Sequence, residues 1–156
     1  MPKRTTRKLH AIQLDSVKVI ELFIRSNHRP EHTTQADTAQ FSLTSSHSPY
    51  DPEKKELRVI AGVEIGMGKK PTTPFSMKIQ LMGFFTIDDS KFDLSQLDDW
   101  ADRNAPLILY PFLREHSFAL SARCGFNPVL LPLMQVPTLI PKPKEKKTTT
   151  ESTFPS

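Results

Sequence analysis

Two histidines form the pattern in this sequence that is most similar to a metal site. His28 and His32 are four residues apart, the spacing at which two imidazoles on one helix can bind the same ion. Pro30 lies between them and favours a loop, and no cysteine or second acidic residue supports them as further ligands. The sequence therefore does not predict a metal centre.

The segment EIGMGKKP, residues 64–71, is superficially similar to a phosphate-binding loop. That loop requires glycine at the first position and serine or threonine at the last position of GxxxxGK[ST]. Here Val63 stands at the first position and Lys70 at the last. A turn between two strands explains the segment better.

The remaining reactive side chains do not form a catalytic set. Cys124, the single cysteine, has no candidate general base nearby in the sequence, so we expect a packed thiol and not a nucleophile. The aspartate pairs 88–89 and 98–99 are typical of solvated turns and helix caps. We therefore expect neither an enzyme nor a bound cofactor.

Charge and composition favour one domain between two basic tails. The chain has 156 residues and a formal net charge of +4, and the segments PKRTTRK (2–8) and KPKEKK (142–147) carry much of the excess. They lack periodic apolar residues and interleaved aromatics, which predicts disorder and no nucleic-acid binding. No apolar run predicts a membrane helix or a secretory signal, so we expect a cytoplasmic protein. The predicted divisions are a tail at 1–8, a domain at 9–140 and a tail at 141–156.

Four segments alternate between apolar and polar residues and predict β-strands. In the first of them the apolar face changes after Asp15 and Ser16, which predicts a bulge or a bend near Asp15 to Lys18. Because short turns separate the later segments, we expect an antiparallel meander with one covered face. The predicted strands are residues 9–25, 38–46, 56–67 and 75–87.

Helical periodicity follows the fourth strand. Asp93 can cap a short helix, and Asn104 can cap a long one that runs to about Cys124 and ends at Gly125. Pro111 lies inside the long helix, where it should remove a backbone hydrogen bond or mark where the regular helix begins. The predicted fold is α+β: a four-stranded antiparallel sheet with a long helix, preceded by a short one, on one face.

The residues after the long helix, NPVLLPLMQVP (127–137), are apolar and rich in proline. We call residues 126–135 the strip. Its prolines exclude a long helix, so its apolar side chains cannot be hidden within one. The strip either closes the core against the sheet or a neighbouring subunit, or it forms the wall of a groove for an extended apolar ligand. In the second case the groove residues are Phe126, Val129, Leu130, Leu131, Leu133 and Met134.

At this point the sequence resembles the SecB family of protein-export chaperones. In that family an NxLFPYxRE helix is followed by SRGxFPPxxLxP, and this chain has NAPLILYPFLREHSFALSARCGFNPVLLPLM. The strand ending IQLMGFFTI is similar to the family's strand ending in GxFxI. The resemblance covers about residues 9–136. Residues at or near matching positions are Asn104, Leu109, Pro111, Arg114, Glu115, Arg123, Gly125, Pro128, Leu131 and Pro132, and in the strand Gly83, Phe85 and Ile87.

The resemblance implies a homotetramer, built as a dimer of dimers, that binds unfolded polypeptides or preproteins without ATP. The groove would keep these clients competent for translocation. It also implies that the long helix packs at the centre of the tetramer and that the strip covers the client groove. We expect the oligomer interface to include Met77, Ile79, Leu81, Phe112, His116 and Leu120.

Several partners remain open at this stage. Typical export members have acidic sheet surfaces and an acidic tail that help dock the SecA motor, whereas this chain is basic and ends in KPKEKKTTTESTFPS. It also lacks the Asn-Phe pair that precedes the second helix of those members. The partner is therefore either SecA or, for a solitary SecB-like chaperone, an antitoxin. A carrier of lipids or small ligands on the same sheet is a further alternative, and we expect no stable membrane insertion.

Overall fold

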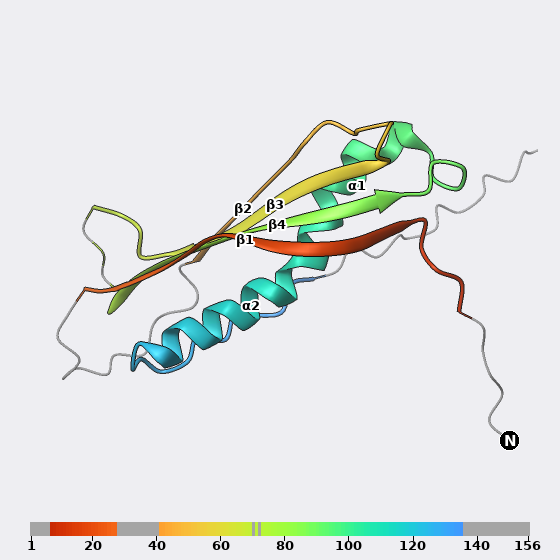
Figure 1. Ribbon diagram of the computed structural model, residues 1–156. Helices are drawn as coiled ribbons and strands as arrows, with labels where there is room; N and C mark the ends of the chain where they lie inside the picture. Colours follow the sequence, from red (N-terminus) through yellow and green to blue (C-terminus); the bar gives the residue numbers. More distant parts are fainter. Residues whose placement is uncertain (1–6, 28–40, 70, 72, 136–156) are drawn as a thin grey trace, which may run out of the picture.

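The computed structural model describes residues 7–27, 41–69, 71 and 73–135 (Figure 1). The predicted tails at 1–8 and 141–156 fall outside these ranges except at residues 7 and 8. A four-stranded antiparallel sheet lies against one long helix, which confirms the predicted α+β class. The elements are β1 (Ile12–Ser26), β2 (Phe41–His47), β3 (Glu56–Ile65), β4 (Phe75–Ile87), the 3-10 turn η2 (Leu94–Gln96), α1 (Leu97–Arg103) and α2 (Ala105–Arg123).

The strand order is β1-β4-β3-β2, so the expected meander is wrong for the first strand. Strands β2, β3 and β4 do follow one another, but β1 pairs with β4, from Ile12 opposite Ile87 to Ser26 opposite Phe75. This is a Greek-key order. The lengths of the strands favour the pairing of β1 with β4. Strand β1 has 15 residues and β4 has 13, whereas β2 has only 7.

Two irregularities bend β1 along its pairing with β4. The register shifts once between Leu14 and Ser16, which makes Asp15 the extra residue and confirms the bulge predicted from the change of apolar face. It shifts again between Val19 and Glu21, a second irregularity that the sequence pattern did not predict. Each extra residue returns the following apolar side chains to the same face of the sheet.

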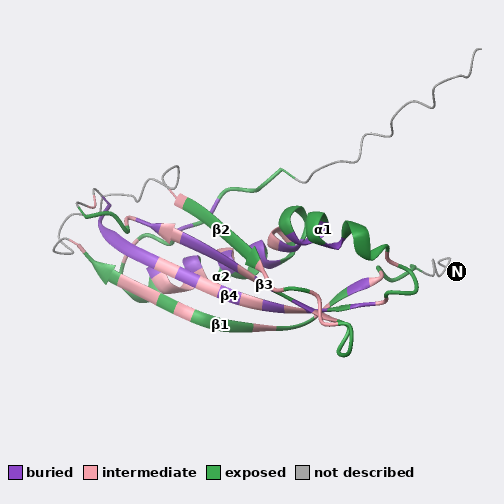
Figure 2. Ribbon diagram, turned by 90° about the horizontal axis from the view of Figure 1, so that it is seen from above, coloured by how far each residue is buried: buried purple, intermediate pink, exposed green. Residues whose placement is uncertain are grey.

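The core lies between α2 and one face of the two central strands, along which Figure 2 shows buried residues alternating with partly buried ones. Gly83 allows the helix to approach closely, since a Cβ added there would lie 2.8 Å from a methyl group of Leu109. Met77, Ile79 and Leu81, predicted at the oligomer interface, are fully buried in this core. They alternate with polar residues on the strand and point towards α2, so we assign them to the core of a single chain.

The helices differ from the predictions at their N-terminal ends. The side chain of Asp93 accepts a hydrogen bond from the backbone of Ser95, as a cap does, but it caps the turn η2. Asn104 makes no side-chain cap, because its backbone is already helical, with φ −102° and ψ −43°. Helix α2 passes through Pro111 without ending, is bent (Figure 1), and stops before Gly125, whose φ is +82°.

Candidate functional site

The strip returns along α2 and is held there by side chains of the helix. The backbone N–H of Val129 donates to Oγ of Ser121 at 2.8 Å. Nε of Arg114 donates to the carbonyl oxygen of Leu131 at 2.9 Å. The hydroxyl of Tyr110 donates to the carbonyl oxygen of Pro132. The strip therefore runs antiparallel to α2, from the C-terminal end of the helix towards its first turns.

The side chains of the strip have two different environments. Val129 and Leu131 are 2% and 0% exposed and belong to the core. The ring of Phe126 packs on that of Phe75, with 4.8 Å between their centroids.

The other three predicted groove residues face outwards. Leu130, Leu133 and Met134 are 60%, 81% and 40% exposed. The sequence left open whether the strip closes the core or forms the wall of a groove. Within one strip some residues close the core and others are exposed, so the groove prediction now rests on Leu130, Leu133 and Met134.

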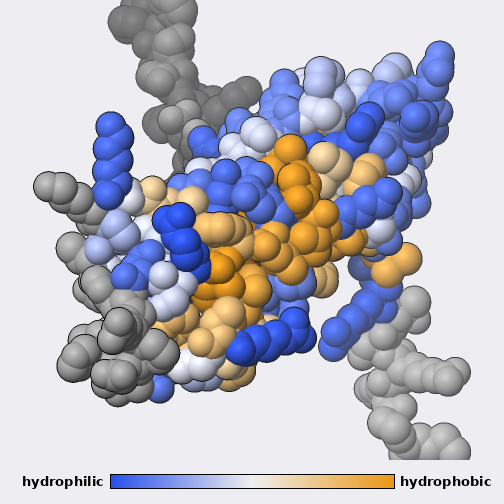
Figure 3. Space-filling view, turned by 60° about the vertical axis from the view of Figure 1, so that its left-hand side comes forward, coloured by the Kyte–Doolittle hydropathy of each residue, from blue (hydrophilic) through white to orange (hydrophobic). Residues whose placement is uncertain are grey.

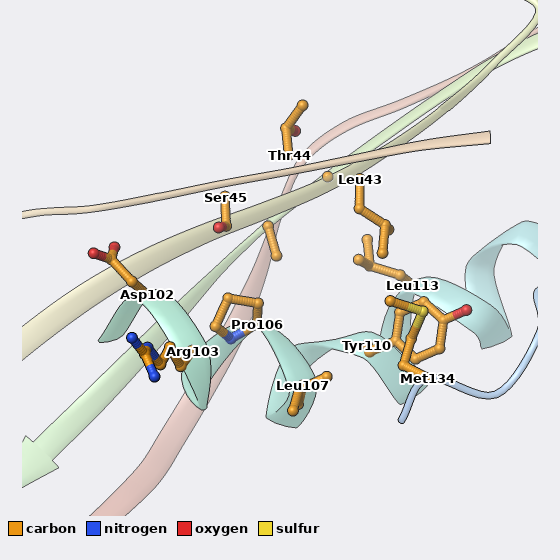
Figure 4. A pocket seen from close by; sticks show the side chains of 12 residues that line it. Leu43, Thr44, Ser45, Asp102, Arg103, Pro106, Leu107, Tyr110, Leu113 and Met134 are labelled. Atoms are coloured by element: carbon orange, nitrogen blue, oxygen red, sulfur yellow. The ribbon is translucent and has the colours of Figure 1, made fainter. Parts of the chain in front are cut away.

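A cavity of about 210 Å³ lies beside the end of the strip, between α2 and the edge strand β2 (Figure 4). Met134 forms one wall, with Tyr110 and Leu113 beside it and Leu43 opposite. Its volume suits one large apolar side chain. The residues that line it are Leu43, Thr44, Ser45, Ala61, Gly62, Asp102, Arg103, Pro106, Leu107, Tyr110, Leu113 and Met134.

One end of this cavity is polar and the rest is apolar. Asp102 and Arg103 stand at the polar end. Nε2 of His47, on β2, lies 3.5 Å from Asp102 and 3.9 Å from Asp98, so an ion pair joins the edge strand to α1 when His47 is protonated. At the apolar end, burial raises the pKa of Tyr110 above its usual value, while the nearby charge of Arg114 opposes the shift. Tyr110 therefore stays a neutral hydrogen-bond donor at physiological pH.

Most of these lining residues were not identified from the sequence. Of the predicted groove residues, Met134 lines the cavity, while Leu43 was predicted only as part of a strand. Leu107 and Tyr110 lie in the long helix, which the resemblance placed at the centre of the tetramer and not at the client groove. Tyr110 offered a signal, because a tyrosine in an apolar run needs a partner for its hydroxyl group.

A second apolar surface lies on the opposite flank of α2, beside β1. A hollow there is lined by residues of β1 together with Phe112 and His116, both predicted at the oligomer interface. Phe112 is 41% exposed and Val19 is 48% exposed, so neither is covered within one chain. Leu120, the last predicted interface residue, is partly buried and packs against the core. Apolar side chains also gather in a band across one face of the molecule (Figure 3).

The sequence's other chemical candidates have the following places. His28 and His32 lie outside the described residues. Within the described ranges there is no group of three or more histidine, cysteine or acidic residues that could hold a metal ion. Cys124 is exposed, which corrects the expected packed thiol, because it follows the last turn of α2 where the chain faces solvent. None of the helices in the described part of the chain is both long enough and apolar enough to cross a membrane.

Comparison with known proteins finds the same family as the sequence motifs. The family model for the preprotein translocase subunit SecB matches residues 6–142. The protein-export protein SecB of Nitrosomonas europaea is 26% identical over 140 residues, covering 88% of this chain and 86% of that protein. The protein of the same name from Methylobacillus flagellatus is 24% identical over 137 residues, with coverages of 88% and 86%.

A solved structure shows a similar fold. It is a SecB-like chaperone of Mycobacterium tuberculosis in complex with a peptide from an antitoxin. The TM-score is 0.58 at 14% sequence identity, and the match covers 80% of this chain and 88% of that one. At this identity the comparison concerns the fold alone.

Proposed function

Because the chain belongs to the SecB family of protein-export chaperones, we propose that it holds unfolded polypeptides or preproteins in the cavity beside Met134 and along the exposed strip. Binding needs no ATP, and it keeps clients competent for translocation. Residues 9–140 form the chaperone domain. The client-binding residues are Leu130, Leu133 and Met134 of the strip, with Leu43, Leu107 and Tyr110 of the cavity.

The observation that carries this proposal is the division of the strip into buried and exposed side chains. Val129 and Leu131 fix the strip in the core, and this leaves Leu133 and Met134 on the surface at a fixed place. An unfolded client exposes apolar side chains that gain about 25 cal/mol for each Å² of apolar area covered. Several such contacts give affinity without a requirement for one client sequence.

We further propose that second copies of the chain cover the other flank of α2 and form a homotetramer. Val19 and Phe112 are large, exposed apolar residues on neighbouring elements, with His116 beside them. A single sheet covered on one face by one helix leaves such surfaces open, and symmetric association buries them. The client cavity lies on the other flank and stays accessible in this arrangement.

A second candidate is a solitary chaperone that guards an antitoxin and does not bind SecA. The charge of the outer sheet face favours it. Lys78 lies between Glu21 at 3.4 Å and Glu64 at 3.9 Å, so acidic charge on this face is neutralised. The face also carries Lys18 and Arg25, and Arg58 there pairs with Glu56 at 3.4 Å. Export members similar to this chain use acidic sheet surfaces to dock SecA, and the solved relative binds an antitoxin peptide.

A client-retention experiment tests the proposed function. The chain is mixed with a reduced and alkylated unfolded protein, and complexes are measured by native mass spectrometry with and without ATP. We expect a complex in both cases. Met134→Ser and Leu43→Ser should each weaken retention by about five- to thirtyfold, which corresponds to about 1–2 kcal/mol per apolar side chain.

Leu9→Ser is the matched control, because Leu9 is 84% exposed and lies outside the cavity lining. It should leave retention unchanged. Failure of the wild-type chain to retain any unfolded protein would remove the proposal. A monomer that instead carries a small ligand would support the carrier alternative.

A further inference from the structure

The strip cannot join α2 or the sheet through a regular pattern of backbone hydrogen bonds. Pro128 and Pro132 have no N–H group to donate. The N–H groups inside α2 are used within the helix itself. The N–H of Phe126, at the start of the strip, donates to the backbone carbonyl of Ser121 at 3.0 Å. Beyond that residue the strip is bonded to the helix by helix side chains, those of Tyr110, Arg114 and Ser121.

Two of these three side chains hold consecutive carbonyl groups. Arg114 binds the carbonyl of Leu131 and Tyr110 binds that of Pro132. The ring of Pro132 also fixes its own φ angle. With two successive peptide groups and one dihedral fixed, the direction in which the chain leaves towards Met134 is set.

We propose that Arg114 is a positioning residue of the client site, and that its Nε–H holds the strip so that Met134 stands in the wall of the cavity. This inference rests on the proposed function for its effect on clients. Met134 lines the cavity, whereas Arg114 is outside the set of lining residues and instead borders a shallow hollow with Phe118 and Leu130. Arg114 therefore acts on a client in the cavity through the strip.

Two substitutions separate the hydrogen bond from the bulk of the side chain. In Arg114→Gln the amide nitrogen lies the same number of bonds from Cα as Nε of arginine, so a donor remains at that position. In Arg114→Met a methyl group takes that position and the donor is lost. Both variants remove the charge. Arg123→Met, at the exposed last turn of the same helix, is the control for charge and for an added methionine.

The first readout is the methyl resonance of Met134 in the free protein, measured by NMR. The chain has five methionines, and the resonance is identified in each background by its loss in Met134→Leu. We expect Arg114→Met to shift and broaden this signal, while Arg114→Gln and Arg123→Met leave it close to its wild-type position. An unmoved signal in Arg114→Met would overturn the inference, whatever clients do.

The second readout is client retention, combined in a double-mutant cycle. Arg114→Met should weaken retention by about fivefold, the effect expected from loss of one typical hydrogen bond. Arg114→Gln should recover most of that loss. If Arg114 acts by placing Met134, then adding Met134→Ser to Arg114→Met should weaken retention little further than Met134→Ser alone.

Additive effects in the cycle would overturn the inference, since they would mean that Arg114 acts on clients independently of Met134. Absence of any retention by the wild-type chain, with the Met134 signal still shifted in Arg114→Met, would remove the proposed function. In that case the placement of the strip by Arg114 would stand.

Discussion

The backbone N–H of Val129 donates to Oγ of Ser121 across 2.8 Å, where the strip meets the last turns of α2. Ser121 is fully buried and Val129 is 2% exposed. The same hydroxyl donates to the carbonyl oxygen of Ser117 at 2.7 Å, so it serves as donor and acceptor at once. A buried N–H without an acceptor is costly, and one serine oxygen therefore supports the start of the strip.

Ser121→Ala should destabilise the chain by about 1–3 kcal/mol, because it leaves the buried N–H of Val129 without an acceptor. Ser117→Ala is the matched control. Ser117 is equally buried, but its hydroxyl donates only to the carbonyl of Leu113, which the helix already satisfies. We expect its effect to stay within about 0.5 kcal/mol. Urea unfolding of both variants measures the difference, and equal losses would show that the bond to Val129 has no special weight.

Leu131 and Met134 should respond in opposite ways to truncation. Leu131 is fully buried, so Leu131→Ala should cost about 2–4 kcal/mol of unfolding free energy. Met134 is 40% exposed, so Met134→Ser should cost less than about 1 kcal/mol. Thermal melting of the two variants side by side is the measurement. A large loss of stability in Met134→Ser would mean that this residue closes the core and does not wall a client site.

Stability should fall in alkaline solution partly because of Tyr110. Burial raises the pKa of Tyr110 above its usual value of 10.0. The unfolded chain therefore releases this proton first as pH rises through about 10, and the free energy of unfolding decreases until the folded-state pKa is passed.

Tyr110→Phe tests this dependence. The variant loses the hydrogen bond to Pro132 at neutral pH, which costs about 1 kcal/mol. Above pH 10 its unfolding free energy should decline less steeply than that of the wild-type chain, because the variant no longer has the titrating group of Tyr110. Some decline should remain, because Tyr50, whose pKa burial also raises, is present in both chains. Urea unfolding between pH of about 8 and 11 gives the two curves. Parallel curves would contradict the assignment.

Phe112→Asp should lower the mass of the assembly. Phe112 is 41% exposed beside β1, and burying a carboxylate there in a subunit interface would remove it from water at a large cost in free energy. Sedimentation at micromolar concentration should show a tetramer for the wild-type chain and smaller species for the variant. Lys54→Asp, an equally drastic change in the exposed turn before β3, should leave the mass unchanged. A wild-type monomer of 17.7 kDa would refute the proposed assembly.

The central strands of the fold were predictable because apolar and polar residues alternate regularly along them. The alternation in β3 and β4 identified strands whose bounds the structure matches within two residues, and the change of face at Asp15 located a bulge. The partner of β1 was not predictable in the same way. Pairing of β1 with β4 depends on the similar length of the two strands and on their apolar faces lying on the same side of the sheet. The residue pattern within one strand contains no information about its partner strand.

The candidate site was predictable only in part for a related reason. The prolines of the strip excluded a helix, but they impose no period, so the pattern did not distinguish buried Leu131 from exposed Met134. That distinction depends on Tyr110, Arg114 and Ser121, which lie 8 to 22 positions away from the backbone groups they bind. Helix α2 also begins six residues before Pro111 and continues through it, so this proline costs one backbone hydrogen bond inside the helix and does not mark where the helix begins.

The Greek-key order has a consequence for synthesis of the chain. Strand β1 is made first, yet its residue Ile12 must wait for Ile87 before the pair can form. At the pace of translation, that interval is on the order of 4–15 seconds. Over this time a 15-residue segment with Val19, Leu22 and Phe23 stays without its partner strand. Each newly made copy thus passes through a state that exposes an extended apolar segment. Under the proposed function, nascent chains of this protein would themselves be clients of finished ones.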